Sequence, residues 1–390
     1  MANIIHMTAE RDGLKLVGAE IRMEDFDAGR RYPAIIVSHG YTGNYSHELP
    51  FAERFTALGY IAYTFSFSGG SADDTPAEYL SEGSSTDMSL LSEVADLTSV
   101  IERVRSLPYI DPERIVLLGF SQGGAVSGLT AALCPWPVEK LVMVYPALCI
   151  PDHARLGILG GGRYDPNDPP EEIACPKMKL GRAFHEEACA MDPYLLLRRY
   201  KGPVLILHGL EDAVVDYAYS VKAQNNYAPG QSRLQLIRCM GHGSDEAQTD
   251  SLFDSVVEFL EGRDEVFSVR VVITRAEEER LPGQTVHRLY FNGWCDSPLF
   301  QGAVLPGGCD TQTVPDGGER TCVADYTLEG LDDAGNCCTI HVVNRMRDGR
   351  WKPAVRTDSA SLSWMNEADF DAVLEHSPTG PTVRFFVKRR

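Results

Sequence analysis

The pattern of hydrophobic and polar positions changes once along this chain, near residue 262. Before that point, short apolar runs alternate with longer stretches in which apolar residues recur at helical spacing. The apolar runs predict strands at residues 15–23, 33–38, 60–67, 115–118, 140–145, 203–207 and 234–239, the first of them at an edge of the sheet. The helical spacing predicts helices at residues 46–58, 86–105, 125–133 and 251–260. This alternation indicates a mostly parallel, doubly wound sheet covered by helices on both faces.

After residue 262 the helical pattern is nearly absent, and short strand patterns are separated by glycine and proline turns. Strands are expected at residues 266–274, 287–291, 320–328, 338–344 and 382–387. Many short strands with turn signals between them are typical of an all-β barrel or sandwich. We therefore expect two domains, an α/β domain at residues 1–262 and an all-β domain at residues 263–390, for which we favour a barrel.

The most informative stretch lies at the end of the fourth predicted strand. Residues 119–123 have the sequence GFSQG, which fits the G-x-S-x-G pattern of a nucleophile elbow. In that motif the serine occupies a strained turn from strand to helix, and the flanking glycines let the backbones pass. The turn places Ser121 at a helix N-terminus, where the helix dipole favours negative charge. The alternative is an ordinary strand–helix turn with an idle serine.

A serine hydroxyl is a weak nucleophile unless a base and an orienting acid accompany it. On this topology the acid and then the histidine follow the serine along the chain. Asp212 lies in the loop after the strand at 203–207, and Glu211 and Asp216 are the competing carboxylates. His242 follows the last strand and is the expected general base. His208 is expected to brace the loop that carries the acid.

A tetrahedral oxyanion requires two preorganised N–H donors. The backbone N–H of Gln122, directly after the serine, is one candidate. The second is the backbone N–H of Tyr41, in the loop after the strand at 33–38. Gly40 lets that loop approach closely because it carries no side chain.

The alternation of strands and helices fails at residues 147–201, where prolines are frequent and residues 160–162 are all glycine. An interruption of this length is more than a connecting loop. Because it follows the strand after Ser121, we expect it to cover that serine as an inserted cap, the alternative being a peripheral excursion. Met178, Leu180 and Phe184 would then contact substrate, or else pack the cap on the body.

Composition narrows the classes of function further. The net charge of −19 argues against nucleic acid or an anionic membrane surface as a partner. No run of apolar residues is long enough to span a membrane, and the first residues lack the pattern of a signal peptide. Ten cysteines without a C-x-x-C pair favour reduced thiols in a cytoplasmic protein. Neither a metal-binding constellation nor a phosphate-binding glycine motif is present, so no cofactor and no metal are expected.

Residues from about 10 to 262 resemble the α/β-hydrolase superfamily. The motifs that carry the resemblance are HGYTG at 39–43, GFSQG at 119–123, HGLED at 208–212 and GH at 241–242. Together they are similar to the cinnamoyl/feruloyl esterase branch, which has an inserted cap in the place of residues 147–201. The resemblance implies a triad and an oxyanion hole on these positions: Ser121, Asp212 and His242, with the amides of Tyr41 and Gln122.

Residues from about 265 to 390 resemble a small β-barrel family of unknown function. The carriers are GAVLPGGCD at 302–310 and YTLEG at 326–330. This resemblance implies a fold and no activity.

These features predict a serine carboxylesterase that hydrolyses small esters through an acyl-enzyme, with aromatic hydroxycinnamoyl-type esters as candidate substrates. An amidase or acyl-peptidase with the same triad is the closest alternative among enzymes. A different class of function would be ligand binding or assembly through the barrel, which is also where a homo-oligomer contact is expected.

Overall fold

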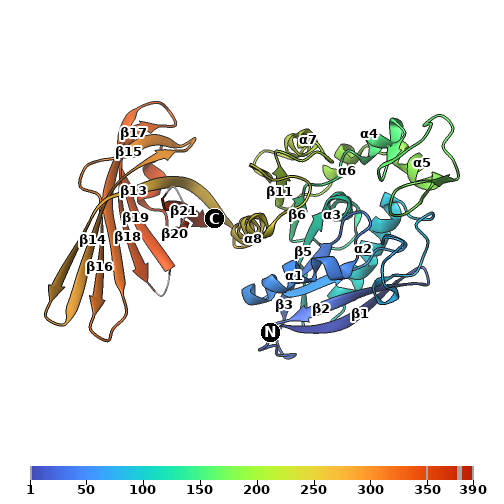
Figure 1. Cartoon of the computed structure of the whole chain (residues 1–390), viewed down its shortest axis with the longest axis horizontal. Coiled ribbons are helices and arrows are strands. Elements are labelled where there is room, and N and C mark those ends of the chain that lie inside the picture. The colour runs from blue at the N-terminus through green and yellow to red at the C-terminus, as the bar shows by residue number, and fades with distance from the viewer. Residues whose placement is uncertain (1, 348–349, 376–379, 389–390) are drawn as a thin grey trace. The chain divides into compact units, whose positions relative to one another are not determined.

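The computed structural model of the chain describes residues 2–347, 350–375 and 380–388, and Figure 1 shows its helices and strands. The chain divides into two compact units, residues 1–256 and 257–390. This division falls within helix α8 (Glu246–Leu260), a little ahead of the boundary expected at residue 262.

The first unit is built on an eight-stranded sheet with the order β1-β2-β4-β3-β5-β6-β11-β12. The strands are β1 (Asn3–Arg11), β2 (Leu14–Arg22), β3 (Tyr32–Ser38), β4 (Ile61–Phe65), β5 (Ile110–Phe120), β6 (Lys140–Val144), β11 (Val204–Gly209) and β12 (Ser232–Ile237). From β4 to β12 every neighbouring pair is parallel, whereas β1 and β2 run antiparallel to their neighbours. The predicted mostly parallel sheet is confirmed, but β1, not β2, occupies the edge, so that part of the prediction is wrong.

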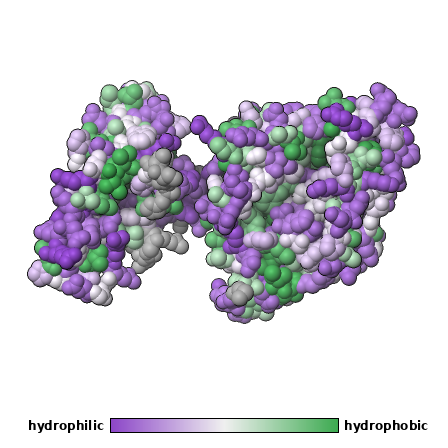
Figure 2. All heavy atoms as spheres, in the orientation of Figure 1, coloured by the Kyte–Doolittle hydropathy of each residue, from purple (hydrophilic) through white to green (hydrophobic). Residues whose placement is uncertain are grey.

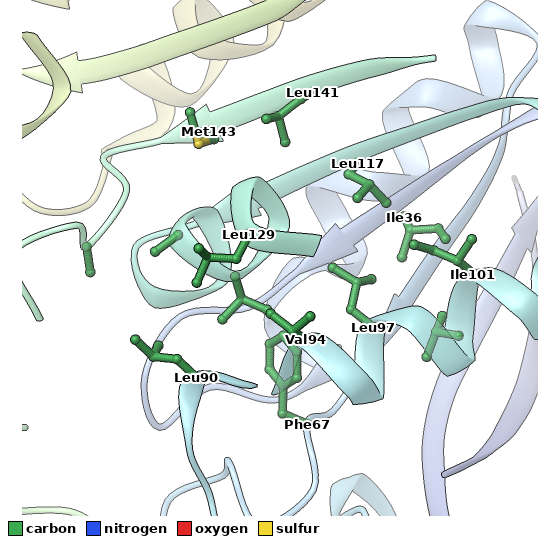
Figure 3. Close-up of a cluster of buried hydrophobic side chains, with 14 of the residues drawn as sticks. Ile36, Phe67, Leu90, Val94, Leu97, Ile101, Leu117, Leu129, Leu141 and Met143 are labelled. Atoms are coloured by element: carbon green, nitrogen blue, oxygen red, sulfur yellow. The ribbon is translucent and has the colours of Figure 1, made fainter. Parts of the chain in front are cut away.

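Helices cover both faces of this sheet. They are α1 (Tyr45–Glu53), α2 (Leu90–Arg105), α3 (Gln122–Leu133), α7 (Ala218–Asn226) and α8, with the 3₁₀ turns Arg54–Leu58 and Ala77–Tyr79. In α2 the apolar residues Val94, Leu97 and Ile101 recur every three or four positions, so they form one stripe. Figure 3 shows this stripe packed against Ile36 of β3 and Leu117 of β5.

The neighbours of these strand residues point to the opposite face, because side chains alternate along a strand. Ile35, Val37, Val116 and Leu118 are all fully buried there. A strand that is buried on both faces needs apolar residues at every position, and this explains the continuous apolar runs in the sequence.

The predicted insertion lies between β6 and β11, which pair directly in parallel. It consists of α4 (Ile150–Arg155), α5 (Arg182–Ala190), α6 (Pro193–Leu197) and two small ladders, β7 (Ile158–Leu159) with β8 (Gly162–Arg163) and β9 (Glu172–Ile173) with β10 (Leu180–Gly181). Its buried residues, such as Phe184 and Leu197, belong to the same core as the sheet.

The second unit is a closed antiparallel β-barrel. Its strands are β13 (Arg263–Leu281), β14 (Gln284–Asp296), β15 (Phe300–Val304), β16 (Cys309–Pro315), β17 (Thr321–Asp332), β18 (Cys337–Arg347), β19 (Arg350–Thr357), β20 (Phe370–Glu375) and β21 (Thr382–Lys388), with a 3₁₀ turn at Ser363–Asn366. Consecutive strands pair, except that β15 and β16 do not pair with each other: both lie between β14 and β17. Strand β13 pairs with both β14 and β21. Among the described residues the ring therefore has eight positions and no free edge, and the predicted barrel is confirmed.

The barrel interior is filled by residues from alternating strand positions, among them Phe267, Phe291, Leu328, Ile340 and Phe385. Phe267 and Phe385 stack with ring centroids 4.4 Å apart. Separate packing of this kind gives the second unit its own hydrophobic core.

Among the residues that the structure describes, no helix is both long and apolar enough to cross a membrane.

Candidate active site

Ser121 lies at the turn from β5 into α3, as the sequence motif predicts. Its backbone has φ 54° and ψ −118°, a conformation that a residue with a side chain rarely adopts. A Cβ on Gly119 would lie 2.2 Å from the carbonyl oxygen of Gly123, and one on Gly123 would lie 2.2 Å from that of His39. Only glycine fits at either position, so the pentapeptide is a packing requirement of the turn.

The Ser121 hydroxyl is hydrogen-bonded to His242. Ser121 Oγ lies 2.9 Å from His242 Nε2, and His242 Nδ1 lies 2.8 Å from Oδ2 of Asp212. Because a carboxylate only accepts, Nδ1–H donates to Asp212 and Nε2 is left to accept the serine proton. The imidazole is 19% exposed and packs at 4.8 Å against the ring of Tyr145. Three residues far apart in sequence thus form one continuous chain of hydrogen bonds.

The Asp212 carboxylate is held by its own loop. Its Oδ1 accepts from the backbone N–H groups of Val214 and Val215, at 2.9 and 2.8 Å. His208 Nε2 lies 3.0 Å from the Val215 carbonyl and 3.3 Å from Asp212 Oδ2, and burial lowers the pKa of this histidine. His208 therefore packs beneath the acid loop as a neutral side chain.

The two competing carboxylates lie elsewhere. Glu211 is exposed, and Asp216 Oδ1 accepts from the backbone N–H of Ala218 at the start of α7. Of the three candidates in this loop, Asp212 is the one that contacts His242.

The loop that carries Tyr41 approaches the serine closely. A Cβ on Gly40 would lie 3.1 Å from Ser121 Cβ, and this explains the glycine. The preceding His39 is buried: its Nε2 accepts from the N–H of Phe67 and its Nδ1–H donates to the carbonyl of Gly40 at 2.7 Å. Burial lowers the pKa of His39 to about 4, so the imidazole stays neutral and fixes the loop.

The sequence interpretation did not assign His39 this role, because its partner at residue 67 is distant in the chain. The signal in the sequence is the residue type. A histidine directly after a buried strand is expected to be buried too, and both of its ring nitrogens then need hydrogen-bond partners.

Gln122, the residue after the serine, is also anchored by its side chain. Its Nε2 donates to Oε2 of Glu93 on α2 at 2.8 Å. Burial raises the pKa of Glu93 to about 8, with further repulsion from Asp96 and Glu187. Glu93 was missed by the sequence interpretation, although an acidic residue on the apolar stripe of α2 is a signal for such a buried contact.

A pocket of about 480 Å³ opens beside Ser121. The loop residues Tyr41 and Gln122 line it, and most of the remaining lining comes from the segment 147–201, including Leu180 and Phe184. Met178 is buried and is not among the lining residues; its carbonyl accepts a hydrogen bond from the Tyr41 hydroxyl at 3.0 Å. Tyr41 thus ties the loop after β3 to the inserted segment.

Acyl transfer requires a nucleophile, a base and an oxyanion site around one pocket, and here Ser121 and Gln122 line the pocket while His242 is hydrogen-bonded to Ser121. Gln122 is the first residue of α3, so its backbone N–H has no partner within the helix. No group of three or more His, Cys, Asp or Glu side chains in the described part of the chain is arranged to hold a metal ion.

Comparison with known proteins agrees with this fold. A family model described as acetyl xylan esterase (AXE1) matches residues 17–261. Est1E from Butyrivibrio proteoclasticus, solved with ferulic acid bound, is 26% identical with a TM-score of 0.58, over 65% of this chain and 97% of Est1E. The α/β hydrolase GrgF from Penicillium sp. sh18 is similar at the level of the fold, with 18% identity and a TM-score of 0.50, over 67% of this chain and 98% of GrgF. The predicted resemblance to the α/β-hydrolases and to their feruloyl esterase branch is confirmed.

A curated relative matches over a shorter stretch. Quorum-quenching protein AidA from Acinetobacter baumannii (strain MDR-ZJ06) is 35% identical over 102 residues, which are 26% of this chain and 31% of AidA. The match spans less than a third of AidA.

Proposed function

The chain belongs to the acetyl xylan esterase family (AXE1), and from that premise we propose that it is a serine carboxylesterase acting on small esters through an acyl-enzyme. The observation that carries the proposal is the chain of hydrogen bonds from Ser121 through His242 to Asp212, at 2.9 and 2.8 Å beside the pocket. Ester hydrolysis is the activity in the name of the family, and the serine mechanism is our inference from these contacts.

In the first step, Ser121 Oγ attacks the ester carbonyl carbon while its proton passes to His242 Nε2. The carbonyl oxygen becomes an oxyanion, which the backbone N–H groups of Tyr41 and Gln122 stabilise. The protonated imidazole is stabilised by Asp212. The tetrahedral intermediate then collapses, His242 gives its proton to the leaving alkoxide, and an alcohol departs from the acyl-enzyme.

In the second step a water molecule attacks the acyl-enzyme, and His242 takes one of its protons. A second tetrahedral intermediate forms in the same oxyanion site. Its collapse returns the proton to Ser121 Oγ and releases the carboxylic acid, so the free enzyme is restored with one water consumed.

The pocket favours an acyl group that carries one aromatic ring. Its volume of about 480 Å³ falls in the range of small-ligand sites, and its walls include Leu180 and Phe184. We propose hydroxycinnamoyl-type esters as substrates, supported by the similarity to the structure solved with ferulic acid. Met178 would act from beneath this wall by fixing Tyr41.

Replacement of the nucleophile tests the proposal. Ser121→Ala should reduce hydrolysis of p-nitrophenyl acetate by about 10³-fold or more and should abolish the mass increase caused by a fluorophosphonate reagent. Ser127→Ala is the matched control, because this serine lies on the same helix and is fully buried; it should stay close to the wild type. Undiminished turnover or labelling in Ser121→Ala would refute the serine mechanism.

A panel of p-nitroanilides separates an esterase from an amidase or acyl-peptidase that uses the same residues. An esterase should cleave the esters at least 10²-fold faster than the matched anilides. Comparable rates would favour the amidase.

We further propose that residues 1–262 form the catalytic domain, that residues 147–201 act as its substrate-binding cap, and that residues 263–390 form a separate domain. The cytoplasmic location and the association of chains through the barrel stay predictions.

A further inference from the structure

The interior of the barrel contains a second cavity of about 160 Å³. The residues that line it come from every position of the ring, and most are apolar, including Val271, Phe291, Trp351 and Val383. The outer surface of strands β14 and β16 is mainly hydrophilic in Figure 2, at the lower left. The cavity is therefore an apolar space enclosed by a barrel whose strands face water on their other side.

Three polar atoms in the cavity wall lack a hydrogen-bond partner among the described residues. They are Oδ1 of Asp310, Oη of Tyr326 and Oδ1 of Asn344. Tyr326 is only 5% exposed and Asn344 only 3% exposed, so bulk water does not satisfy them. Buried polar side chains almost always have partners, and an exception in a cavity wall points to a partner that enters the cavity.

The ladder register shows why these groups are unpaired. Asp310 on β16 lies opposite Ala324 on β17, and Ala324 lies opposite Asn344 on β18. The two polar side chains are therefore at one level, separated by a strand that contributes only a methyl group. Neighbouring strands are about 4.8 Å apart, so the gap between Asp310 and Asn344 is about 10 Å, too wide for a direct hydrogen bond. Tyr326 follows Ala324 on the same face of β17.

Burial of the lining residues differs between the two ends of the cavity. Phe291, Tyr326 and Asn344 form its deep end and are buried, whereas Gln312 and Trp351 are half-buried. The Gln312 side chain donates to Oδ2 of Asp310 at 2.6 Å, which orients the carboxyl and leaves Oδ1 free to face the cavity. A ligand that entered past Trp351 would meet the three polar atoms near the inner end.

The lining fixes the chemical class of the ligand. A cavity of about 150 Å³ accommodates a benzene ring, so one ring fits here. Asp310 and Asn344 offer acceptor oxygens and Tyr326 offers a hydroxyl, which suits a ligand with hydroxyl groups. The residues described as lining the cavity include no Lys or Arg, so a carboxylate ligand would meet Asp310 with no cation in the cavity wall. Burial raises the pKa of Asp310, in keeping with a site for uncharged ligands. The charge of Arg320 acts in the opposite direction and lowers this pKa, but Arg320 is not one of the lining residues.

We propose that the barrel is a binding site for a neutral, single-ring ligand that carries hydroxyl groups, held by Asp310, Tyr326 and Asn344 inside an apolar wall. The site is independent of the serine chemistry, and its ligand need not be an ester. The proposal stands on the cavity and its unpaired polar atoms, and it holds whether or not the first unit is an esterase.

Titration calorimetry of the full chain with phenol, and with benzoate at pH 7.5, tests the proposal. We expect phenol to bind saturably with one site per chain and benzoate to bind at least tenfold more weakly. Tyr326→Phe keeps the ring and removes the hydroxyl, so it should weaken phenol about tenfold, the loss expected for one hydrogen bond. Tyr290→Phe is the matched control on the outward face of β14, where the hydroxyl donates to Glu277, and should bind as the wild type does.

A substitution that fills the cavity gives a second measurement. Ala324→Leu should abolish phenol binding, whereas Ala303→Leu adds the same volume at an exposed position of β15 and should leave it unchanged. Circular dichroism of each variant establishes that the barrel is folded. Failure of the folded wild type to bind phenol at millimolar concentration, benzoate binding equal to that of phenol, or phenol binding that survives Ala324→Leu would overturn the proposal and leave a cavity filled by water only.

Discussion

The two units each contain an apolar pocket with a few polar groups, and they differ in how those groups are connected. Beside Ser121 the polar side chains bind one another, through the contacts of Ser121 with His242 and of Gln122 with Glu93. In the barrel, Tyr326 has no partner among the described residues.

This difference separates two kinds of site. A reacting group must be oriented and activated before its substrate arrives, so its partners belong to the protein. A group that only recognises a ligand can lack a hydrogen-bond partner in the free protein. This lowers the stability of the fold, and the bound ligand restores it by supplying the missing hydrogen bond. The comparison therefore predicts large effects on activity from changes in the first unit and small effects on stability from changes in the barrel cavity.

The largest effect is expected for the acid. Asp212→Asn should lower kcat by about 10³- to 10⁴-fold, because an amide favours the wrong tautomer of His242. Asp216→Asn is the matched control in the same loop, since its carboxylate accepts from the backbone N–H of Ala218 at the start of α7. Steady-state rates on p-nitrophenyl acetate measure both, and a larger loss from Asp216→Asn would transfer the role of acid to that residue.

A change at Glu93 should alter the pH dependence of stability. The pKa of Glu93 is raised from 4.5 to about 8 in the folded chain. Between these values of pH the folded chain therefore keeps a proton on Glu93 that the unfolded chain releases. The free energy of unfolding should therefore fall as pH rises from about 4.5 to 8, by up to a few kcal/mol from this group. Glu93→Gln keeps the contact with Gln122 and removes the titration, so thermal melts should show a variant more stable than the wild type at pH 8.5 and nearly equal at pH 4.5.

Glu113→Gln, at an exposed position of β5, is the control for this measurement and should follow the wild type at both values of pH. Parallel pH profiles for Glu93→Gln and the wild type would contradict a buried, protonated carboxyl beside Gln122.

A smaller effect is expected in the pocket wall. Phe184→Ala should change the ratio of kcat/KM for feruloyl against acetyl esters by about tenfold, because pocket contacts of one side chain discriminate by about 1–3 kcal/mol. Equal losses on both esters would show that Phe184 serves only to pack the inserted segment.

The smallest effect is expected in the barrel cavity. Tyr326→Phe should leave the free energy of unfolding unchanged or raise it by about 1 kcal/mol, because it removes an unpaired buried hydroxyl. Tyr63→Phe is the contrasting change, since that buried hydroxyl donates to Glu20 at 3.1 Å, and it should cost about 1–3 kcal/mol. Denaturant titrations of both variants give the comparison, and a loss at Tyr326 as large as that at Tyr63 would mean that its hydroxyl has a partner.

The parts of the fold that were predicted from the sequence are those with a local hydrophobic pattern. Strands buried on both faces, such as β3 and β6, are recognised by continuous runs of apolar residues. The long helix α2 is recognised by apolar residues at helical spacing. Strand β1 was missed because only Met7 and Ala9 are buried along it. Helix α7 was missed because Ser220 and Ala223 are its only buried residues and neither is a large apolar one.

In the barrel, four strands escaped prediction for related reasons: β15, β16, β19 and β20. Strand β19 contains Pro353, which argues against a strand in any sequence-based interpretation. Strand β15 contains Gly302, where a Cβ would lie 2.5 Å from the carbonyl oxygen of Glu329 on β17. That glycine is required by the neighbouring strand, a fact that no local pattern contains.

In the candidate site, too, the features that depend on local sequence were predictable and the contacts between distant segments were not. The motif around Ser121 is local, so its turn and its glycines could be predicted, and the order of the acid and the histidine follows from the topology. The contacts of Glu93 with Gln122 and of His39 with Phe67 join distant segments. Only a folded chain brings those pairs together. The same holds for Asp310 and Asn344, which come from different strands to the same height of the barrel cavity.

The closure of the barrel has a consequence for the synthesis of the protein. Strand β13 is the first of the ring to leave the ribosome and β21 is the last, yet the two must pair. Until β21 emerges, β13 and the growing end of the sheet each present an unpaired edge, and such edges recruit strands from other chains. The nascent second unit is therefore most prone to aggregation until its last strand has emerged from the ribosome.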